Sequence, residues 1–283
     1  MSFSSRSMAI MTAVLFLVLP AVKAVEVCKV ADLRLVTQTG EFFLAVTFLV
    51  MGVSTVGYVL LAFKAIHEKR KFHFAMCFVT AIATFSYYAM LSGQGWLITP
   101  ACRQLFYVRY IEWMSTTPLL MLVLGMLADA DIAYLLAVMG GTAMMIFGGL
   151  MATISSGHIK WLWFTLSLGV FFALAFVMVR GFKVLVEKNH PSIFELYNKV
   201  STLAAISWAL YPVVFIFSEG TGDWSPNFEI MLYSVLDILS KVVFGYIVLL
   251  SHEGLDRLVG LKGMPAAPTA NYGTPTSKSF AAI

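Results

Sequence analysis

Four ionisable residues stand in the middle of long apolar runs, and their types and spacing could do chemistry. Arg109 and Glu112 are three residues apart in one run, while Asp237 and Lys241 are four apart in another. Either spacing places both members of a pair on one face of a helix. A desolvated lysine is a nucleophile that can form a Schiff base with an aldehyde, and the two carboxylates could be its counterions. A structural ion-pair network between two helices is the alternative.

The composition places these residues in a membrane. Of the 283 residues, 60% are hydrophobic and 12% are charged, whereas an ordinary soluble domain has about 25% charged residues. This excludes a soluble globule and a disordered chain. The net charge of +4 is too small and too scattered to indicate nucleic acid as a partner. We therefore predict an all-α integral membrane protein in contact with lipid, because helices satisfy their own backbone groups there.

Seven apolar runs have the length of about 20 residues that a membrane-spanning helix needs. Short connections between them predict antiparallel neighbours. Basic residues gather in the first and fifth connections, which the positive-inside rule assigns to the cytoplasm. We predict a multi-pass bundle in the plasma membrane, with the N-terminus outside and the C-terminus cytoplasmic. The predicted spans are residues 40–63, 72–95, 105–128, 131–153, 159–182, 195–218 and 227–251.

The two ends of the chain differ from the predicted seven-helix domain, residues 40–253. Residues 1–24 have the layout of a secretory signal peptide, with a short helix at the membrane surface as the alternative. Residues 25–39 are mixed and polar and are predicted to be an extracellular segment. Residues 254–283 are rich in Pro, Gly, Thr and Ser and are predicted to be a flexible cytoplasmic tail.

Three cysteines are too few for a disulfide framework. Cys77 lies in an apolar run and is predicted to pack as a small hydrophobic residue. Cys28 and Cys102 both fall on the predicted outside. They could pair with each other, remain free thiols, or leave Cys28 to pair between subunits.

Three segments resemble the microbial (type 1) rhodopsin family. Residues 109–120 read Arg-Tyr-Ile-Glu-Trp-Met-Ser-Thr-Thr-Pro-Leu-Leu and resemble the third-helix signature of that family, with Glu112 in place of the common Asp. Residues 236–245 resemble the retinal-binding seventh helix, and residues 208–212 resemble the pocket motif of the sixth. The resemblance extends over all seven runs and is to the bacteriorhodopsin-like proton-pump branch.

The resemblance implies a cofactor and the residues that hold it. Lys241 would carry all-trans retinal as a Schiff base, with Asp237 and Glu112 as counterions. Trp113, Trp208 and Tyr211 would enclose the polyene, and Leu at position 120 resembles green-absorbing members. The other implied pocket residues are Tyr87, Thr116, Thr117, Met145 and Phe215, the last at a position that is often Trp. No metal site is implied.

The resemblance also implies a path for protons. Glu112 would be the primary proton acceptor. Glu219 and Glu229 resemble paired carboxylates of a release group, with Arg109 between them and the retinal site. Two close carboxylates could share one proton; two solvated loop acids are the alternative.

A carboxylate donor on the cytoplasmic side is missing from this path. The residue eleven positions after Glu112, about 16 Å along the helix, is Val123, and its neighbours are apolar as well. His73 and Cys77 are possible substitutes, with a loop-end base and a packed thiol as their ordinary roles. We therefore expect slow reprotonation of the Schiff base.

The leading functional prediction is a slow, light-driven outward proton pump. A light-gated channel for another small ion is the first alternative, although Thr116-Thr117-Pro118 resembles the pump branch and the run past Thr117 is apolar. A photosensory receptor is the second alternative; the missing donor favours it, and the tail carries no evident signalling module. Nothing resembles a hydrolytic or transfer site, so we do not expect an enzyme. A homo-oligomer is expected because many family members form trimers or pentamers.

Overall fold

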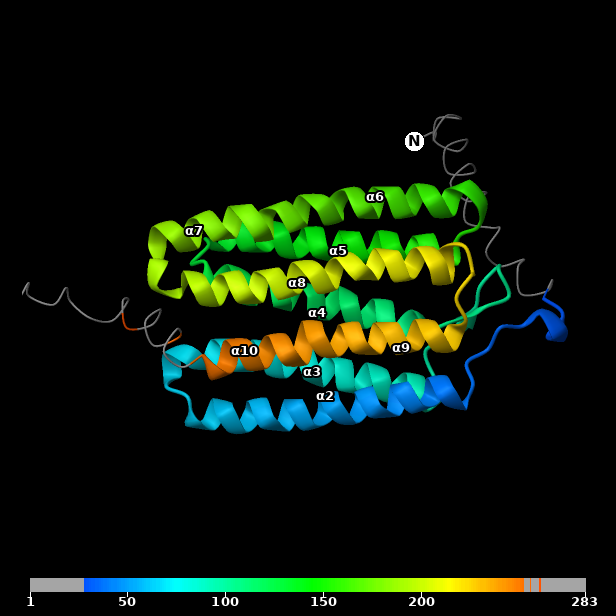
Figure 1. The fold of residues 1–283 in the computed structure, drawn as a ribbon, viewed down its shortest axis with the longest axis horizontal. Helices are drawn as coiled ribbons and strands as arrows, with labels where there is room; N and C mark the ends of the chain where they lie inside the picture. The colour runs from blue at the N-terminus through cyan, green and yellow to red at the C-terminus, as the bar shows by residue number, and fades with distance from the viewer. Residues whose placement is uncertain (1–27, 252–254, 256–259, 261–283) are drawn as a thin grey trace, which may run out of the picture.

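The computed structural model describes residues 28–251 together with Leu255 and Gly260. Within this part of the chain, seven helical spans are long and apolar enough to cross a membrane. They lie side by side as a bundle (Figure 1), which confirms the predicted seven-helix, all-α fold. The predicted signal peptide and most of the predicted tail lie outside the described residues.

The first four spans are single α-helices; π-helical turns interrupt the fifth and seventh spans and end the sixth. Short 3₁₀ turns, η3 (His67–Lys69) and η5 (Pro191–Ile193), precede α3 and α8. The spans are α2 (Gln38–Lys64); α3 (Arg70–Leu91); α4 (Tyr107–Leu127); α5 (Ile132–Ile154); α6 (Gly157–Phe176) with η4 (Val177–Gly181) and α7 (Phe182–Asn189); α8 (Phe194–Phe215) with η6 (Ile216–Gly220); and α9 (Pro226–Asp237) with η7 (Ile238–Val243) and α10 (Phe244–Leu250).

Most predicted span boundaries lie within a few residues of the observed ones, and two differ for identifiable reasons. The second span was predicted to reach residue 95 but ends at Leu91. Gly93 and Gly95 follow with φ of +76° and +68°, a left-handed conformation that ends a helix. The fifth span continues to Asn189 rather than 182, because its last turns are polar and the hydropathy signal stops before the helix does.

The spans with the four central ionisable residues are the most enclosed. In α4 and in the seventh span, 61% of the residues in the most apolar window are buried, against 11% in the fifth span. Contacts of α2 with both α3 and α9 close the ring of helices (Figure 1). The inner spans can therefore bring their charged side chains together away from lipid.

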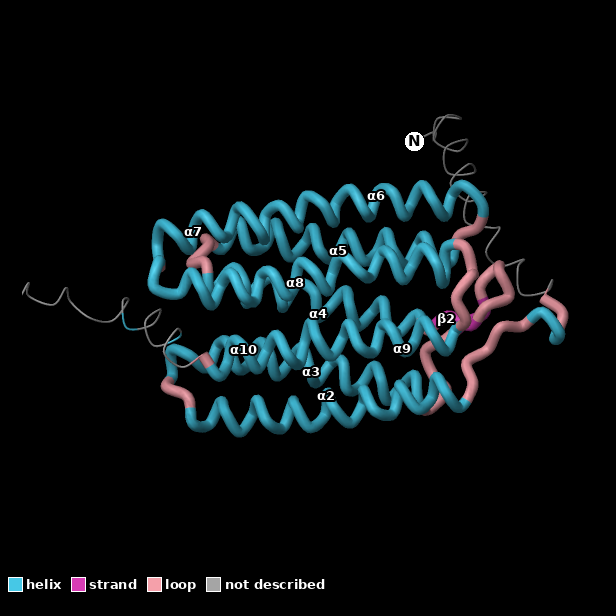
Figure 2. The backbone as a smooth tube through the Cα atoms, in the orientation of Figure 1, coloured by secondary structure: helices cyan, strands magenta, loops and turns pink. Residues whose placement is uncertain are grey.

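A small sheet closes one end of the bundle, which the sequence pattern does not predict (Figure 2). Strand β1 (Leu97–Ile98) pairs antiparallel with β2 (Gln104–Leu105), and Arg34 forms a parallel bridge to Arg103. Residue 105, predicted as helical, is therefore in a strand. A disulfide joins Cys28 to Cys102, so the first of the three alternatives for these cysteines is the one observed. We call this the hairpin end and the opposite end, where α10 finishes, the tail end.

Toward the tail end the interior is a large apolar cluster. Val123, Leu124 and Phe244 are among its fully buried members. Leu255, two residues beyond the predicted end of the bundle, is also buried in it, and its N–H donates to the carbonyl of Ser251. Packing therefore continues past residue 253.

Candidate functional site

Lys241 lies in the π-helical turn η7, in the middle of the seventh span. Its Nζ is 2.5 Å from Asp237 Oδ1 and 3.3 Å from Glu112 Oε1, and all three side chains are buried. Tyr58 of α2 donates its hydroxyl to the carbonyl of Val242 (2.7 Å), next to the lysine. Single π turns are frequent at functional sites, and this one aims an ammonium group between two carboxylates from different spans.

Asp237 is the more heavily hydrogen-bonded of the two carboxylates. Its Oδ1 accepts from Lys241 Nζ, Tyr211 OH (2.6 Å) and Trp113 Nε1 (3.2 Å), and its Oδ2 accepts from Tyr87 OH (2.7 Å). Four donors from three other spans and its own span thus converge on one group. Donors of this kind stabilise the ionised form of a buried carboxylate.

Glu112 has fewer partners. Thr116, one turn along α4, donates its hydroxyl to Glu112 Oε1 (2.9 Å), and Lys241 approaches the same oxygen. The second oxygen, Oε2, is buried and has no hydrogen-bond partner among the described residues. Glu112 is therefore less strongly held as an anion than Asp237.

An apolar cavity begins at Lys241 and lies between the aromatic side chains predicted to form a pocket. Those predicted residues that line it are Trp113, Thr117, Leu120, Met145, Trp208, Tyr211, Phe215 and Lys241. Tyr87 and Thr116 do not line it and instead donate to the carboxylates. The sequence pattern misses Phe164 and Phe171, two lining residues from α6, because nothing distinguishes them from lipid-facing aromatics before the helices are packed.

Arg109 points away from the lysine and toward the hairpin end. Its Nη1 donates to Glu229 Oε1 (2.9 Å), and its guanidinium lies 4.7 Å from the centre of the Tyr233 ring. No ion pair joins it to Glu112 among the described residues. Arg109 therefore stands between the lysine site and a second polar cluster, as the family resemblance implies.

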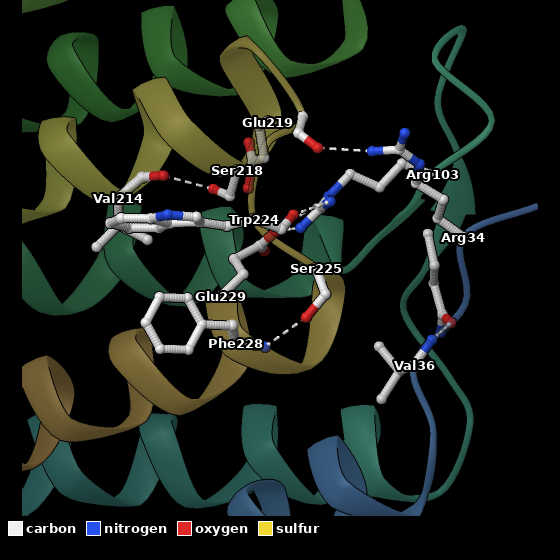
Figure 3. Close-up of polar contacts among 12 residues, drawn as sticks. Arg34, Val36, Arg103, Val214, Ser218, Glu219, Trp224, Ser225, Phe228 and Glu229 are labelled. Carbon is white, nitrogen blue, oxygen red and sulfur yellow. Dashed lines mark hydrogen bonds and ion pairs between the residues drawn. The ribbon is translucent and has the colours of Figure 1, made fainter.

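The second cluster contains Glu219 and Glu229, and both side chains are buried. This contradicts the alternative of two solvated loop acids. Arg103, from the hairpin, donates through Nε (3.1 Å) and Nη2 (2.5 Å) to Glu229 Oε2 and through Nη1 to the carbonyl of Trp224 (2.8 Å), as Figure 3 shows. Glu229 is thus held by two arginines.

Glu219 has neutral partners at its carboxyl group. Its Oε2 lies 2.5 Å from both Tyr110 OH and Thr153 Oγ1. Lys160 Nζ donates to the backbone carbonyl of Glu219 (2.6 Å) rather than to its side chain. The sequence pattern does not identify Tyr110, Thr153, Lys160 or Arg103 as site residues. Tyr110 stands beside Arg109 in the third-helix signature, but the other three are recognisable only once the spans are assembled.

On the tail side of Lys241 the predicted donor position is apolar. Val123 is fully buried in the large apolar cluster, and Cys77 packs against the same cluster as a small hydrophobic residue. The side chain of His73 is buried, with Nδ1 3.1 Å from the carbonyl of Lys69. No carboxylate takes the place of Val123 among the residues of this cluster.

The chain belongs to the bacteriorhodopsin-like protein family, whose model matches residues 38–255. Opsin-1 of Neurospora crassa is 31% identical over 238 residues, which cover 77% of this chain and 78% of that protein. Bacteriorhodopsin of Halobacterium salinarum is 33% identical over 189 residues, covering 65% of this chain and 72% of the relative. The resemblance inferred from the three segments is therefore confirmed.

Solved structures of similar proteins have the same fold over nearly their whole length. A light-driven proton pump from Leptosphaeria maculans has a TM-score of 0.76 and 26% identity, covering 80% of this chain and 98% of the other. A light-driven proton pump from Coccomyxa subellipsoidea has a TM-score of 0.75 and 29% identity, covering 78% and 100%.

Proposed function

We propose that this protein is a light-driven pump that moves protons outward with a slow cycle. The observation that carries the proposal is the position of Lys241 Nζ, between Asp237 and Glu112 at one end of an apolar cavity. The similarity to two light-driven proton pumps over more than three quarters of the chain supports it.

The cavity fits all-trans retinal. It runs between side chains of α4, α5, α6 and α8 to Lys241, and small-molecule sites are typically mostly apolar clefts of this kind with a few polar groups. Its walls are almost entirely apolar, as a polyene requires. Trp113, Trp208 and Tyr211 would hold the chain of the cofactor, with Thr117, Leu120, Met145 and Phe215 around it. Bound as a Schiff base at Lys241 Nζ, retinal would supply light absorption and an isomerisation that redirects the Nζ proton.

The two carboxylates then have different roles. Asp237, with four donors, stays ionised and keeps the positive charge of Nζ paired. Glu112, which has one side-chain hydroxyl donor and one oxygen without a partner, accepts the Nζ proton at its carboxylate. Glu112 has one methylene more than the Asp common in the family, but its carboxylate still contacts Lys241, since the Nζ–Oε1 distance is 3.3 Å.

The second cluster completes the outward route. Arg109 lies between the lysine site and Glu229 and can respond to the charge on Glu112. Glu219 and Glu229 form the release side, at the hairpin end. The Cys28–Cys102 disulfide supports placing this end outside, because disulfides persist in oxidising compartments. The basic residues of the first connection lie at the other end, which supports a cytoplasmic tail end.

The return of a proton to Nζ sets the rate of the cycle. The path from the tail end passes the apolar cluster around Val123, so a proton must cross without a carboxylate relay. Reprotonation of Lys241 Nζ is therefore slow. The same apolar barrier disfavours a light-gated channel, because an ion would have to pass it without polar ligands. We further propose a multi-pass homo-oligomer in the plasma membrane.

Photocurrent measured against voltage in retinal-supplied cells tests the pump proposal. An outward current at every voltage that persists without other permeant ions is the expected result. A current that reverses near the equilibrium potential of an ion would establish a channel instead, and a normal visible band with no current would favour a photosensor. The Lys241→Ala variant should lose the visible band and the current together, because no Nζ remains; a retained band would refute the attachment site.

A further inference from the structure

The release side has an asymmetry that the pairing of two carboxylates does not explain. Glu229 receives three charge-assisted hydrogen bonds, two from Arg103 and one from Arg109. Among the described residues, no lysine or arginine nitrogen forms an ion pair with the Glu219 carboxyl. Two buried acids thus differ in their partners, which are cationic at Glu229 and neutral at Glu219. Charge-assisted hydrogen bonds are roughly twice as strong as neutral ones.

The hydrogen-bond contacts around the Glu219 carboxyl group outnumber the hydrogens that the neighbouring hydroxyl groups can supply. Tyr110 OH, Thr153 Oγ1 and Glu219 Oε2 lie within 2.5–2.7 Å of one another, and Thr153 Oγ1 is 3.1 Å from the carbonyl of Gly149. These are four contacts, whereas the two hydroxyls carry only two hydrogens. A proton on Glu219 Oε2 fills a third contact and lets Thr153 donate to Gly149. The geometry therefore suits a protonated Glu219.

The hairpin holds the guanidinium of Arg103 against one carboxylate, that of Glu229. Its backbone carbonyl accepts from Thr99 N (2.9 Å), and its neighbours Cys102 and Gln104 pair with Arg34 through the backbone (2.8 and 2.9 Å). Its third guanidinium nitrogen is occupied by the carbonyl of Trp224. The hairpin thus presents a fixed fork to one carboxylate, as Figure 3 shows.

We propose that Arg103 is a positioning residue that keeps Glu229 ionised as the partner of Arg109, so that Glu219 alone holds the proton released to the outside. This inference rests on the proposed pump function. It replaces a proton shared between two carboxylates by a division of roles, in which Glu229 anchors arginines and Glu219 carries the proton. Lys160, the remaining cation at Glu219, is bound to its backbone carbonyl and leaves the carboxyl to the hydroxyls.

Infrared spectra of the retinal-loaded protein in lipid vesicles, recorded in the dark, test this division of roles between Glu219 and Glu229. The carboxylic-acid C=O band assigned to the release side should disappear in Glu219→Gln and remain in Glu229→Gln. Loss of the band in Glu229→Gln alone, or its weakening in both variants, would overturn the proposal in favour of Glu229 or of a shared proton. This readout does not depend on pumping. An absence of light-driven acidification would refute the pump proposal, whereas the infrared spectra would still show which carboxyl group holds the proton.

The role of Arg103 is tested with a second arginine of the hairpin end, Arg34, as the control. Arg103→Gln removes two charged donors from Glu229 and should produce a second carboxylic-acid band that Arg103→Gln/Glu229→Gln lacks, because charge-assisted bonds favour the ionised carboxylate. Arg34→Gln, which loses only a bond to the carbonyl of Gly222, should retain the wild-type spectrum. Arg103→Lys should show a second band weaker than that of Arg103→Gln, because lysine keeps the charge but cannot donate two fixed bonds to one carboxylate. Spectra of Arg103→Gln that match those of Arg34→Gln would overturn the positioning role.

If Arg103→Gln does not assemble, the Arg103→Lys spectrum decides in its place. A weak second band then supports the positioning role, and the absence of a second band refutes it.

Discussion

At the scale of single residues, the number and kind of donors distinguish carboxylates that are alike in type and burial. Asp237 and Glu112 both approach Lys241 Nζ, yet Asp237 has three further donors while Glu112 has one. A proton goes to the anion that loses least when it is neutralised. The same comparison separates Glu219 from Glu229 at the other cluster. The assignment of roles therefore depends on neighbours rather than on residue type.

Glu112→Gln tests the acceptor assignment. Removing the negative charge beside Nζ should shift the visible absorption to the red and abolish the light-driven loss of the Nζ proton, since no acceptor remains at that position. Transient absorption in the near ultraviolet reports that proton loss. Glu195→Gln, which breaks only an exposed pair with Lys199, should leave both signals unchanged. Unaltered proton loss in Glu112→Gln would mean that another group accepts the proton.

At the scale of elements, two of the π-helical turns receive a tyrosine hydroxyl from a neighbouring span. Tyr58 donates to the carbonyl of Val242 in η7, and Tyr197 donates to the carbonyl of Met178 in η4, both at 2.7 Å. A π turn disturbs the regular ladder of backbone hydrogen bonds, and in lipid an acceptor without a donor is costly. These hydroxyls therefore stabilise the irregular turns, including the one that carries Lys241.

Tyr58→Phe should destabilise the turn at Lys241. Leaving the Val242 carbonyl without its donor should cost about 1 kcal/mol and lower the temperature at which the visible band bleaches. Tyr88→Phe removes an exposed hydroxyl from the lipid-facing side of α3 and is the matched control. Equal bleaching temperatures for the two variants would contradict a stabilising role of Tyr58.

The apolar half of α4 is the second feature at this scale. Val123→Asp places a proton donor on the face of Glu112 and should speed recovery of the dark state by about a hundredfold, the usual contribution of a positioned acid. Leu122→Asp puts the same acid at nearly the same depth on another face and should change recovery far less. Time-resolved absorption of the returning dark band measures both. Recovery that is equally slow in the two variants would remove this explanation of a slow cycle.

At the scale of the whole molecule, the segment before α2 is part of the hairpin end. The disulfide connects Cys28 to Cys102 across 74 positions of sequence, and Arg34 joins the edge of the hairpin by backbone hydrogen bonds. The hairpin in turn holds Arg103 against Glu229 from the seventh span. The hairpin end of the bundle is thus assembled from parts of the chain that are distant in sequence.

Replacing both Cys28 and Cys102 by serine should lower the stability of the protein. A native disulfide typically stabilises a protein by about 2–4 kcal/mol, so the midpoint of thermal bleaching should fall by several degrees. Wild-type protein treated with a reductant should behave in the same way, whereas Cys77→Ala should not respond to the reductant differently from wild type. A midpoint that is insensitive to both treatments would show that the disulfide adds no stability.

The sequence alone determined the class of the molecule and the charged residues at its centre. Seven apolar runs determine seven spans because a helix of about 20 residues satisfies its backbone within itself. Arg109, Glu112, Asp237 and Lys241 are conspicuous because charges in such runs are costly, and periodicity places each pair on one face. Most of the pocket residues that the family resemblance implies do line the cavity.

Only the tertiary structure decided which groups meet across the bundle. Arg103 lies 126 positions from Glu229, and Tyr110, Thr153 and Glu219 come from three different spans. The hairpin, too, depends on pairing with a segment that precedes α2. A hydropathy or helical period reports the environment of one element, but a hydrogen bond or ion pair between elements depends on their relative rotation and depth. Those are set by packing of the whole bundle, which no local pattern contains.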